Sequence, residues 1–256
     1  MEWLVILAGG AGSRLNSSRL TPKPMVVIEQ NPMIASVIQM FEFAEVKNIV
    51  LCLGFGKEAV IEYFEKTYTP AIGWQQKRSH NLIFFENETK KTHIYLLDTG
   101  ERNQTGSRLK QGLNFLKNLG AANTFVSYCD GFSDIDFNAF YKSFIKQKSN
   151  LSLVVATPKI QYGVIEFNTD KIATKFTEKP QANYFVSAGF FAMNVEYVRS
   201  FLNDDESLNF EETVLPKMIQ SGNVSVFVHT GFWQTVDNLK DINTLREQCP
   251  LKNLQL

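Results

Sequence analysis

Apolar residues in the first 157 positions form short runs that alternate with segments of helical spacing. Residues 4–8 are a continuous apolar run of strand length, which predicts a buried strand. Ile34, Val37, Ile38 and Phe41 recur at intervals of three and four, so they share one face of a predicted helix. The alternation continues, with strands expected at residues 48–53, 93–97, 124–128 and 151–157 and helices at residues 57–65, 106–119 and 137–147. This order predicts an α/β fold, with a mostly parallel sheet and helices on both faces.

After Pro158 the pattern changes to shorter strands with turns between them. We expect strands at residues 161–168, 172–177, 188–193 and 224–229, and helices at residues 211–220 and from about residue 238. Thr169-Asp170 suits a hairpin turn, and Gly222 suits the end of a helix. No linker is visible, so we expect one domain over residues 1–256, whose last third extends the sheet and covers its open end.

The polar segment 66–92 shows no clear periodicity. We interpret it as a long excursion from the sheet, with a role in assembly as one use for it. It is the part of the chain for which the pattern predicts least.

Composition and charge narrow the class of protein. Hydrophobic residues make up 44% of the chain, which is enough for a continuous core. The 26 basic residues balance 26 acidic ones, so neither a disordered chain nor a dedicated binder of nucleic acid or anionic membrane is expected. The apolar start of the chain is short, contains Glu2 and is followed by glycines, so it matches neither a secretory signal nor a membrane span. We therefore expect a cytoplasmic protein.

Cysteines and histidines are scattered. The three cysteines form no Cys-x-x-Cys pair, which argues against a disulfide framework and a zinc ribbon. The three histidines do not cluster, so a histidine-rich metal site is not expected.

A glycine-rich segment, Gly9-Gly10-Ala11-Gly12-Ser13-Arg14, directly follows the first predicted strand. Ligands of parallel sheets bind at the carboxyl ends of strands, and glycines there let backbone N–H groups approach a phosphate. The segment does not match the P-loop pattern, because it lacks the lysine of that pattern. It does not match the dinucleotide-binding pattern either, because the third glycine of that pattern is missing. A plain tight turn is the alternative. Arg14 favours a polyphosphate site, because its planar fork pairs with two oxygens.

Lys23 lies between two prolines in Thr21-Pro22-Lys23-Pro24-Met25. The prolines restrict the backbone on both sides and exclude an α-helix at this point. Such a frame suits a lysine that must point at a fixed target. An exposed lysine in a proline-rich turn is the alternative.

Further motifs follow in order along the chain. They are Asp98-Thr99-Gly100, Thr105-Gly106-Ser107-Arg108, Asp130-Gly131, Glu178-Lys179-Pro180 and Gly231-Phe232-Trp233-Gln234 with Asp237. With the glycine loop and Pro22-Lys23-Pro24, they resemble the sugar-1-phosphate nucleotidyltransferases over about residues 1–247. Within this family, Asp98-Thr99-Gly100, the segment from Thr105 to Arg108 and the segment from Gly231 to Gln234 with Asp237 are similar to the cytidylyltransferase branch. The resemblance implies the nucleotide-diphospho-sugar transferase fold, with a Rossmann-like mixed sheet, a nucleotide-binding core in residues 1–157 and a sugar-phosphate side with a small β elaboration in residues 158–256.

The resemblance also implies a reaction: a cytidylyl group passes from CTP to a sugar 1-phosphate, with α-D-glucose 1-phosphate expected, and pyrophosphate is released. Two phosphate-bearing reactants repel each other, so positioning and charge neutralisation must supply most of the catalysis. By the resemblance, Arg14 holds the β- and γ-phosphates and Lys23 neutralises charge on the α-phosphate. Asp130 and Asp237 hold Mg²⁺, which accepts one or two carboxylates together with phosphate oxygens.

The other implied site residues divide between the two substrates. The nucleotide would contact Leu7, Ala8, Gly9, Gly10, Gly12, Ser13, Thr105, Arg108 and Cys129. The sugar phosphate would contact Glu178, Lys179, Ser187 and Gly189. Within that set, Lys179 would bind the phosphate and Glu178 the sugar hydroxyls. The resemblance further implies a homo-oligomer and, through CDP-sugars, a place in surface polysaccharide or deoxysugar synthesis.

Several of these residues have a plainer interpretation. Asp130 could cap the following helix, and Asp237 with Asn238 could begin the last one. Glu178-Lys179 could be a solvated turn. Cys129 lacks a histidine close by in sequence, so we interpret it as a small strand residue and not as a nucleophile.

The chain departs from the family pattern at three places. Thr21 stands where the relatives have a first lysine, Cys129 where a glycine precedes the metal-binding aspartate, and Ser187 where an asparagine faces the sugar. The last two changes keep open a different nucleotide or a different sugar or polyol phosphate. A non-catalytic nucleotide-sugar sensor is a further alternative, whereas a dehydrogenase is disfavoured by the failed dinucleotide pattern.

Overall fold

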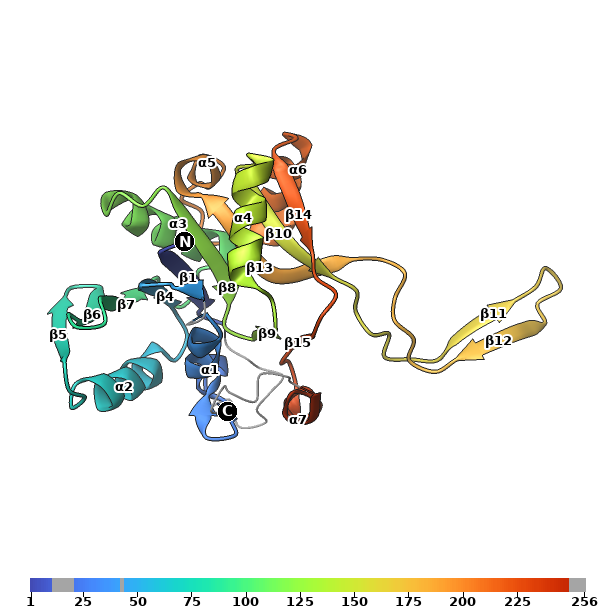
Figure 1. The fold of residues 1–256 in the computed structure, drawn as a ribbon, viewed down its shortest axis with the longest axis horizontal. Helices are drawn as coiled ribbons and strands as arrows, with labels where there is room; N and C mark the ends of the chain where they lie inside the picture. Colours follow the sequence, from blue (N-terminus) through green and yellow to red (C-terminus); the bar gives the residue numbers. More distant parts are fainter. Residues whose placement is uncertain (11–20, 42–43, 249–256) are drawn as a thin grey trace.

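The computed structural model describes residues 1–10, 21–41 and 44–248, and a nine-stranded sheet forms its centre (Figure 1). The strand order is β14-β10-β13-β8-β1-β4-β7-β6-β5. These strands are β1 (Trp3–Ala8), β4 (Asn48–Leu53), β5 (Trp74–Ser79), β6 (Leu82–Asn87), β7 (Thr92–Asp98), β8 (Asn123–Tyr128), β10 (Leu151–Ala156), β13 (Val186–Asn194) and β14 (Val224–Val228). β13 and β6 run opposite to the remaining strands. The expected mixed, mostly parallel sheet is confirmed.

Helices pack on both faces of this sheet, as predicted. One face is covered by α1 (Met33–Met40), α2 (Lys57–Tyr68) and α4 (Phe137–Gln147), and the other by α3 (Thr105–Asn118), α5 (Val195–Arg199) and α6 (Leu215–Gln220). The last helix, α7 (Leu239–Gln248), lies against β15 (Trp233–Thr235), and its Ile242 and Leu245 join the first core. The central strand β1 shows why both faces are apolar. Leu4 and Ile6 enter the first core and Val5 and Leu7 the second, because successive strand residues point to opposite sides.

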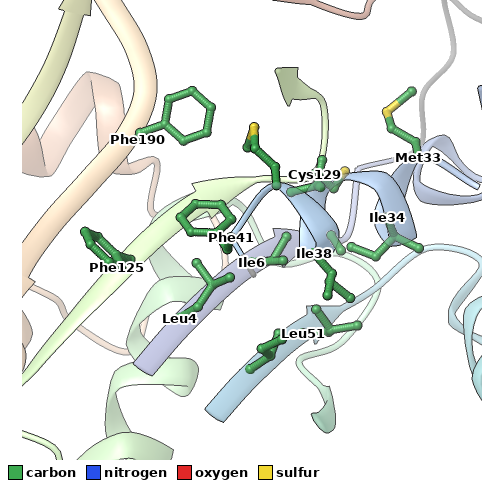
Figure 2. Packing of buried hydrophobic residues seen from close by; sticks show 14 of the residues in the cluster. Leu4, Ile6, Met33, Ile34, Ile38, Phe41, Leu51, Phe125, Cys129 and Phe190 are labelled. Carbon is green, nitrogen blue, oxygen red and sulfur yellow. The ribbon is translucent and has the colours of Figure 1, made fainter. Parts of the chain in front are cut away.

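Aromatic rings fill the first core beneath the carboxyl end of β1. Figure 2 shows Phe41 close to Leu4 and Ile6 of the central strand. The ring of Phe41 stacks on that of Phe137 with centroids 4.1 Å apart and lies 6.0 Å from that of Phe125. This packing joins α1 and α4 to the strands whose ends carry the site described below.

The segment 66–92 is not an excursion, and that interpretation is wrong. Helix α2 runs on to Tyr68, and the rest forms the hairpin β5–β6, which pairs with β7 and extends the sheet to its edge. Ile83 and Phe85 point into the first core and alternate with less buried neighbours. The pattern was hard to detect because β5, with the sequence WQQKRS, is the polar edge strand.

A two-stranded arm, β11 (Val164–Phe167) and β12 (Ala173–Thr177), extends far from the sheet (Figure 1). Thr169-Asp170 form the turn at its tip, as predicted. Both strands were expected, and this hairpin is a part of the last third that does not extend the sheet. Its large apolar side chains are exposed, namely Ile165, Phe167, Ile172 and Phe176.

Short elements near the carboxyl end of β1 were not predicted. They are the 3₁₀ turn η1 (Lys23–Met25), the strand pair β2 (Val27–Ile28) and β3 (Asn31–Pro32), and the strand pair β9 (Gly131–Ser133) and β15 (Trp233–Thr235). The helix expected at residues 211–220 is present as the π-helical turn η3 (Phe210–Val214) followed by α6. Gly222 follows α6 with φ of 77°, which confirms it as the residue that ends this helix.

Candidate active site

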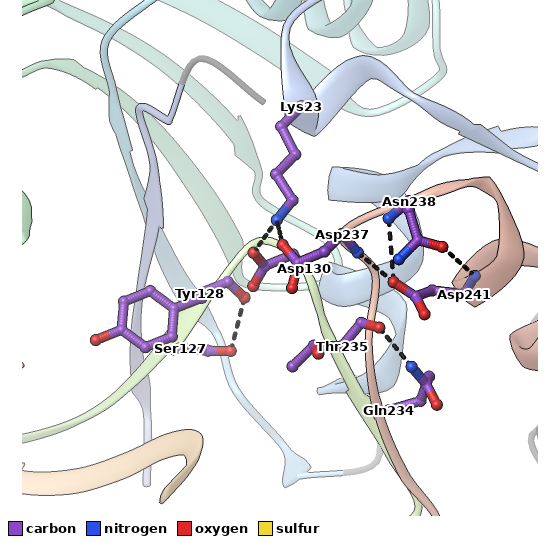
Figure 3. Close-up of polar contacts among 9 residues, drawn as sticks. All are labelled: Lys23, Ser127, Tyr128, Asp130, Gln234, Thr235, Asp237, Asn238 and Asp241. Carbon is purple, nitrogen blue, oxygen red and sulfur yellow. Dashed lines mark hydrogen bonds and ion pairs between the residues drawn. The ribbon is translucent and has the colours of Figure 1, made fainter. Parts of the chain in front are cut away.

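Lys23, Asp130 and Asp237 meet at one point, although they come from three distant parts of the chain. The Nζ atom of Lys23 lies 2.5 Å from Oδ2 of Asp130 and 2.7 Å from Oδ1 of Asp237. Figure 3 shows the lysine reaching down between the two carboxylates. The sequence pattern predicted these three residues as site residues, and the fold brings them together.

The strands around this cluster explain how it forms. Asp130 follows β8 at its carboxyl end and precedes β9, which pairs antiparallel with β15. The N–H of Val236 donates to the carbonyl of Asp130 over 3.0 Å, so the pairing continues one step past β15. Asp237 is the next residue, and it is therefore held beside Asp130.

Neither aspartate serves as the helix cap that the plainer interpretation suggested. Asp136 caps α4 by accepting from the N–H of Ala139, and α7 begins at a reciprocal pair formed by Asn238 and Asp241. Asp241 also accepts from the backbone N–H of Asp237 over 2.9 Å. The carboxylate of Asp237 is thus left to Lys23 while its backbone starts the helix.

Lys23 begins the turn η1, directly after Pro22 in an extended conformation. Its side chain is 12% exposed, so an exposed lysine in a loop is excluded. Burial acts to lower the pKa of Lys23, but the carboxylates of Asp130 and Asp237 outweigh burial and raise the pKa above its usual value. The ammonium therefore stays charged at neutral pH.

Gly9 and Gly10 follow β1 at the edge where the cluster lies. Leu7 and Ala8 are buried strand residues, and a side chain on Gly9 would overlap the guanidinium of Arg108. Gly10 is exposed, and apart from its neighbours in the chain no atom of the described residues lies within 4 Å of where its side chain would begin. The other predicted residues of this loop, Gly12, Ser13 and Arg14, lie outside the described part of the chain.

Arg108 is 4% exposed and binds the protein's own backbone. Its guanidinium donates to the carbonyls of Leu53, Gly9 and Glu101, at 3.0, 3.3 and 3.0 Å, and to the hydroxyl of Thr99. Burial lowers the pKa of Arg108 from its usual value. The cation therefore ties together the ends of β1 and β4 from beneath the glycine loop.

Thr105, a second predicted nucleotide contact, is also engaged within the protein. Its hydroxyl donates to Oε2 of Glu211 over 2.8 Å and accepts from the N–H of Phe210. The N–H of Gly106 donates to the carbonyl of Leu208, and a side chain on Gly106 would come within 2.8 Å of that oxygen. The start of α3 thus anchors the segment that leads into η3.

Glu178 and Lys179 lie where the arm returns to the body. Lys179 forms an ion pair of 3.2 Å with Glu178, and both side chains are about half exposed. The backbone of Lys179 has a positive φ of 46°, which is uncommon for a residue with a side chain. Among the described residues, no hydrogen bond or ion pair joins this pair to Lys23.

Ser187 and Gly189 belong to β13, beside β8. Gly189 has φ of 82°, and a side chain there would approach the ring of Tyr128. Nε1 of Trp233 donates to the carbonyl of Ala188 over 2.9 Å, so this tryptophan holds the predicted sugar side in place. Cys129 is buried, and burial raises its pKa far above the usual value, which is unsuitable for a nucleophile.

The pair Asp130 and Asp237 suits a hard divalent cation. Both carboxylates lie within 2.7 Å of one nitrogen, so their oxygens can reach a shared ligand. The described residues contain no cluster of three or more histidine, cysteine, aspartate or glutamate side chains suited to a metal. Two carboxylates that leave the remaining positions to phosphate oxygens and water match the preference of Mg²⁺.

Comparison with known proteins identifies the family. A family model described as nucleotidyl transferase matches residues 4–249. The chain belongs to the nucleotidyl transferase family. The resemblance inferred from the motifs is confirmed at this level, and the protein is an enzyme of the nucleotidyltransferase type.

Relatives of this nucleotidyltransferase cover nearly its whole length. It is 29% identical over 243 residues to the glucose-1-phosphate cytidylyltransferase of Salmonella typhimurium, with 93% of this chain and 91% of the relative aligned. It is 27% identical to a probable glucose-1-phosphate cytidylyltransferase of Bacillus subtilis, with 95% and 96% aligned. A mannose-1-phosphate guanyltransferase of Kluyveromyces lactis is 26% identical, with 97% of this chain and 67% of the relative aligned.

Solved structures confirm the fold of the nucleotidyltransferase. HddC from Yersinia pseudotuberculosis superposes with a TM-score of 0.70 at 22% identity, covering 96% of this chain and 99% of that one. A putative glucose-1-phosphate thymidylyltransferase from Bacillus anthracis gives a TM-score of 0.69 at 14% identity, covering 96% of this chain and 94% of that one.

Within the described residues, none of the helices is both long and apolar enough to cross a membrane.

Proposed function

We propose that this nucleotidyltransferase transfers a cytidylyl group from CTP to a sugar 1-phosphate, with α-D-glucose 1-phosphate as the acceptor. The observation that carries this proposal is the meeting of Lys23 with Asp130 and Asp237 at the carboxyl edge of the sheet. The choice of nucleotide and sugar is supported by the names of the relatives from Salmonella typhimurium and Bacillus subtilis. Both substrates are metabolites of the cytoplasm, where we propose that the reaction takes place.

The reaction is a single in-line displacement. A phosphate oxygen of the sugar 1-phosphate forms a bond to the α-phosphorus of CTP, and the bond from that phosphorus to the oxygen bridging to the β-phosphate breaks. Pyrophosphate leaves with the bonding electrons. Lys23 neutralises charge that grows on the α-phosphate.

Asp130 and Asp237 would hold a divalent cation, for which we propose Mg²⁺. The bound ion supplies charge neutralisation for the phosphate oxygens of the nucleotide. The Nζ atom of Lys23 lies between the two carboxylates. We propose that Lys23 turns from this pair toward the α-phosphate when nucleotide and cation bind.

The nucleotide would lie over the glycine loop. Gly10, which is exposed, and the predicted residues Gly12, Ser13 and Arg14 would face the phosphates. Leu7 to Gly9 would contact the base or ribose through their backbone. We propose that Arg108 and Thr105 serve the nucleotide by holding the loop and the start of α3, since both are bonded to protein groups.

The acceptor would bind with Lys179 on its phosphate and Glu178 on its hydroxyls, near Ser187 and Gly189.

We further propose that the enzyme is a homo-oligomer in which the arm β11–β12 packs on a second copy. The arm exposes Ile165 and Phe176, which form a cross-strand pair. Exposed apolar side chains on a two-stranded hairpin require a partner surface.

The direct test is an assay for pyrophosphate release with CTP, Mg²⁺ and glucose 1-phosphate. We expect CDP-glucose and pyrophosphate in equal amounts, and loss of both in Asp130→Asn that remains folded by circular dichroism. Near-normal turnover in Asp130→Asn would contradict the metal-binding role of this residue.

A second candidate is the same transfer with another nucleotide or another sugar or polyol phosphate. Cys129 and Ser187 motivate it, because they replace residues that the relatives place near the nucleotide and the sugar. A matrix of four nucleoside triphosphates against several sugar and polyol 1-phosphates separates the candidates. Nucleotide binding without any product would instead support a nucleotide-sugar sensor.

A further inference from the structure

His229 lies just after β14, and its backbone N–H donates to the carbonyl of Val155 over 2.8 Å. Its ring faces three groups through the same nitrogen. Nε2 lies 3.0 Å from Oδ1 of Asp134, 3.0 Å from the carbonyl oxygen of Phe232 and 3.1 Å from the hydroxyl of Ser133. The Nε2 end of the ring is therefore held by residues at the end of β9 and by the residue that precedes β15.

These contacts determine which ring nitrogen carries the proton. The carbonyl of Phe232 and the carboxylate of Asp134 only accept hydrogen bonds. The hydroxyl of Ser133 donates to the carbonyl of Phe232 over 2.7 Å, so it too can only accept from the histidine. Nε2 must consequently carry a hydrogen, and in the neutral ring Nδ1 is left as an acceptor.

The neighbourhood is built for this arrangement. A side chain on Gly231 would overlap Oδ1 of Asp134 and come within 2.8 Å of Cε1 of His229, so only glycine lets the pair lie this close to the chain. The His229 side chain is 10% exposed, and the described residues offer Nδ1 no hydrogen bond. Its one free polar atom thus has a fixed position.

His229 lines a cleft of about 510 Å³ that is also lined by Lys179, the residue proposed to bind the phosphate of the acceptor. Lys179 and Gln181 line it from the base of the arm, and Trp233, Gln234 and Thr235 of β15 line it on the other side. Thr235 pairs with Gly131, the residue after Asp130, so the cleft and the cluster at Lys23 share the β9–β15 pair. Lys159, Lys179 and Lys240 outnumber Asp241 among its charged groups, which favours an anionic ligand.

We propose that Nδ1 of His229 accepts a hydrogen bond from a ring hydroxyl of the sugar phosphate and so contributes to the choice of acceptor. This inference rests on the proposed function, because it takes the acceptor to be a sugar 1-phosphate bound in this cleft. Asp134 and Ser133 act as positioning residues, since they hold the tautomer and the orientation of the ring. An acceptor atom fixed in this way discriminates against a sugar without the matching hydroxyl.

The test uses His229→Gln in the full-length enzyme. The amide nitrogen of glutamine can replace Nε2 as the donor to Asp134 and Phe232, but no atom replaces Nδ1. We expect KM for glucose 1-phosphate to rise about 5- to 10-fold, as for one lost hydrogen bond, with kcat and KM for CTP unchanged. One of the 2-, 3-, 4- or 6-deoxy forms of glucose 1-phosphate should show a raised KM with the wild type and the same KM with His229→Gln.

His93→Gln is the matched control. Nδ1 of His93 is hydrogen-bonded to Asn48 over 2.8 Å near the amino ends of β4 and β7, at the opposite edge of the sheet from the cluster. This variant should leave every KM unchanged. Wild-type KM values for all acceptors in a folded His229→Gln protein would overturn the inference and leave the proposed function standing.

A second measurement does not depend on the variant or on turnover. The ¹⁵N resonance of His229 Nδ1 should move when glucose 1-phosphate is added to the wild type, while that of His93 stays in place. If no acceptor gives pyrophosphate, the proposed function fails, and this titration still decides the inference. An unmoved Nδ1 resonance at saturating glucose 1-phosphate overturns it, as does the absence of any binding.

Discussion

The guanidinium of Arg108 occupies the space that a side chain on Gly9 would need. It donates to the carbonyl of Gly9 over 3.3 Å and to that of Leu53 over 3.0 Å, so one buried cation joins the ends of β1 and β4. At the ends of adjacent parallel strands, some backbone carbonyls have no hydrogen-bond partner in the neighbouring strand. Arginine has five N–H donors, so one side chain can bind several of these carbonyls at once. The loop that follows β1 therefore starts from a rigid point.

Gly9→Ala should destabilise the protein. The added methyl group forces Arg108 from its hydrogen bonds with buried carbonyls, at a cost of about 1–3 kcal/mol in the free energy of unfolding. Gly10→Ala is the control, because Gly10 is exposed, and it should change stability by less than about 0.5 kcal/mol. Urea denaturation measures both. Equal stability of the two variants would contradict the role assigned to Arg108.

Lys23→Met should lower turnover by about 10²–10³-fold, because charge on the α-phosphate loses its fixed cation. The measurement is the initial rate of pyrophosphate release at saturating substrates. Lys66→Met serves as control, since Lys66 is exposed and pairs only with Glu62 among the described residues. A loss of less than about tenfold would show that Lys23 has a structural role and no electrostatic one.

Asp237 and Asp241 are four residues apart and should respond differently to substitution. Asp237→Asn should abolish activity, because its carboxylate faces Lys23 where the divalent cation is proposed to bind. Asp241→Ala should lower the free energy of unfolding by about 1 kcal/mol, because it removes the cap of α7. Its activity should fall far less than that of Asp237→Asn. Parallel assays and thermal melts of the two variants make the comparison. The reverse ranking of activities would contradict the assignment of Asp237 to the metal.

The sequence was sufficient to predict the parallel part of the fold. Its strands are continuous apolar runs, and the order of strands and helices implies which end of the sheet binds ligands. Asp130 could be placed on this basis, because it follows the buried strand β8. Lys23 could be singled out by the prolines on either side of it, whereas Asp237 could be named only from the resemblance, because β15 is a three-residue element without periodicity.

Other features depend on tertiary context that a linear pattern does not contain. The strand β5 is polar because it lies at a sheet edge, so its sequence resembles a loop. Thr105 and Arg108 were expected to face the nucleotide, yet their hydrogen bonds run to Glu211 and to strand-end carbonyls. The dyad of Asp134 and His229 unites residues 95 positions apart, for which the sequence offered no signal.

Stability at alkaline pH should report on Lys23. Its pKa is raised in the folded protein, so its contribution to stability is complete below the unfolded value of about 10.5 and is lost as pH rises through the folded pKa. The free energy of unfolding of the wild type should therefore fall more steeply above about pH 10 than that of Lys23→Met. Urea titrations at several alkaline pH values measure the difference. If the free energy of unfolding depended on pH in the same way for both proteins, the ion pairs of Lys23 with Asp130 and Asp237 would not contribute to stability in solution.

Residues on the two faces of the arm should differ in their effect on assembly. Ile165 and Phe176 are paired across the strands on one face and are exposed, whereas Glu166 and Lys175 form an ion pair of 2.8 Å on the other. The double variant Ile165→Ser with Phe176→Ser should dissociate the oligomer without lowering the melting temperature of the subunit, because neither side chain belongs to the core. The matched double variant Glu166→Gln with Lys175→Gln should keep the wild-type mass, because an exposed ion pair contributes little. Light scattering over a range of concentrations compares the three proteins, and a monomeric wild type would contradict the proposed assembly. Since Glu178 and Lys179 lie at the root of this arm, loss of the oligomer should also raise KM for the sugar phosphate.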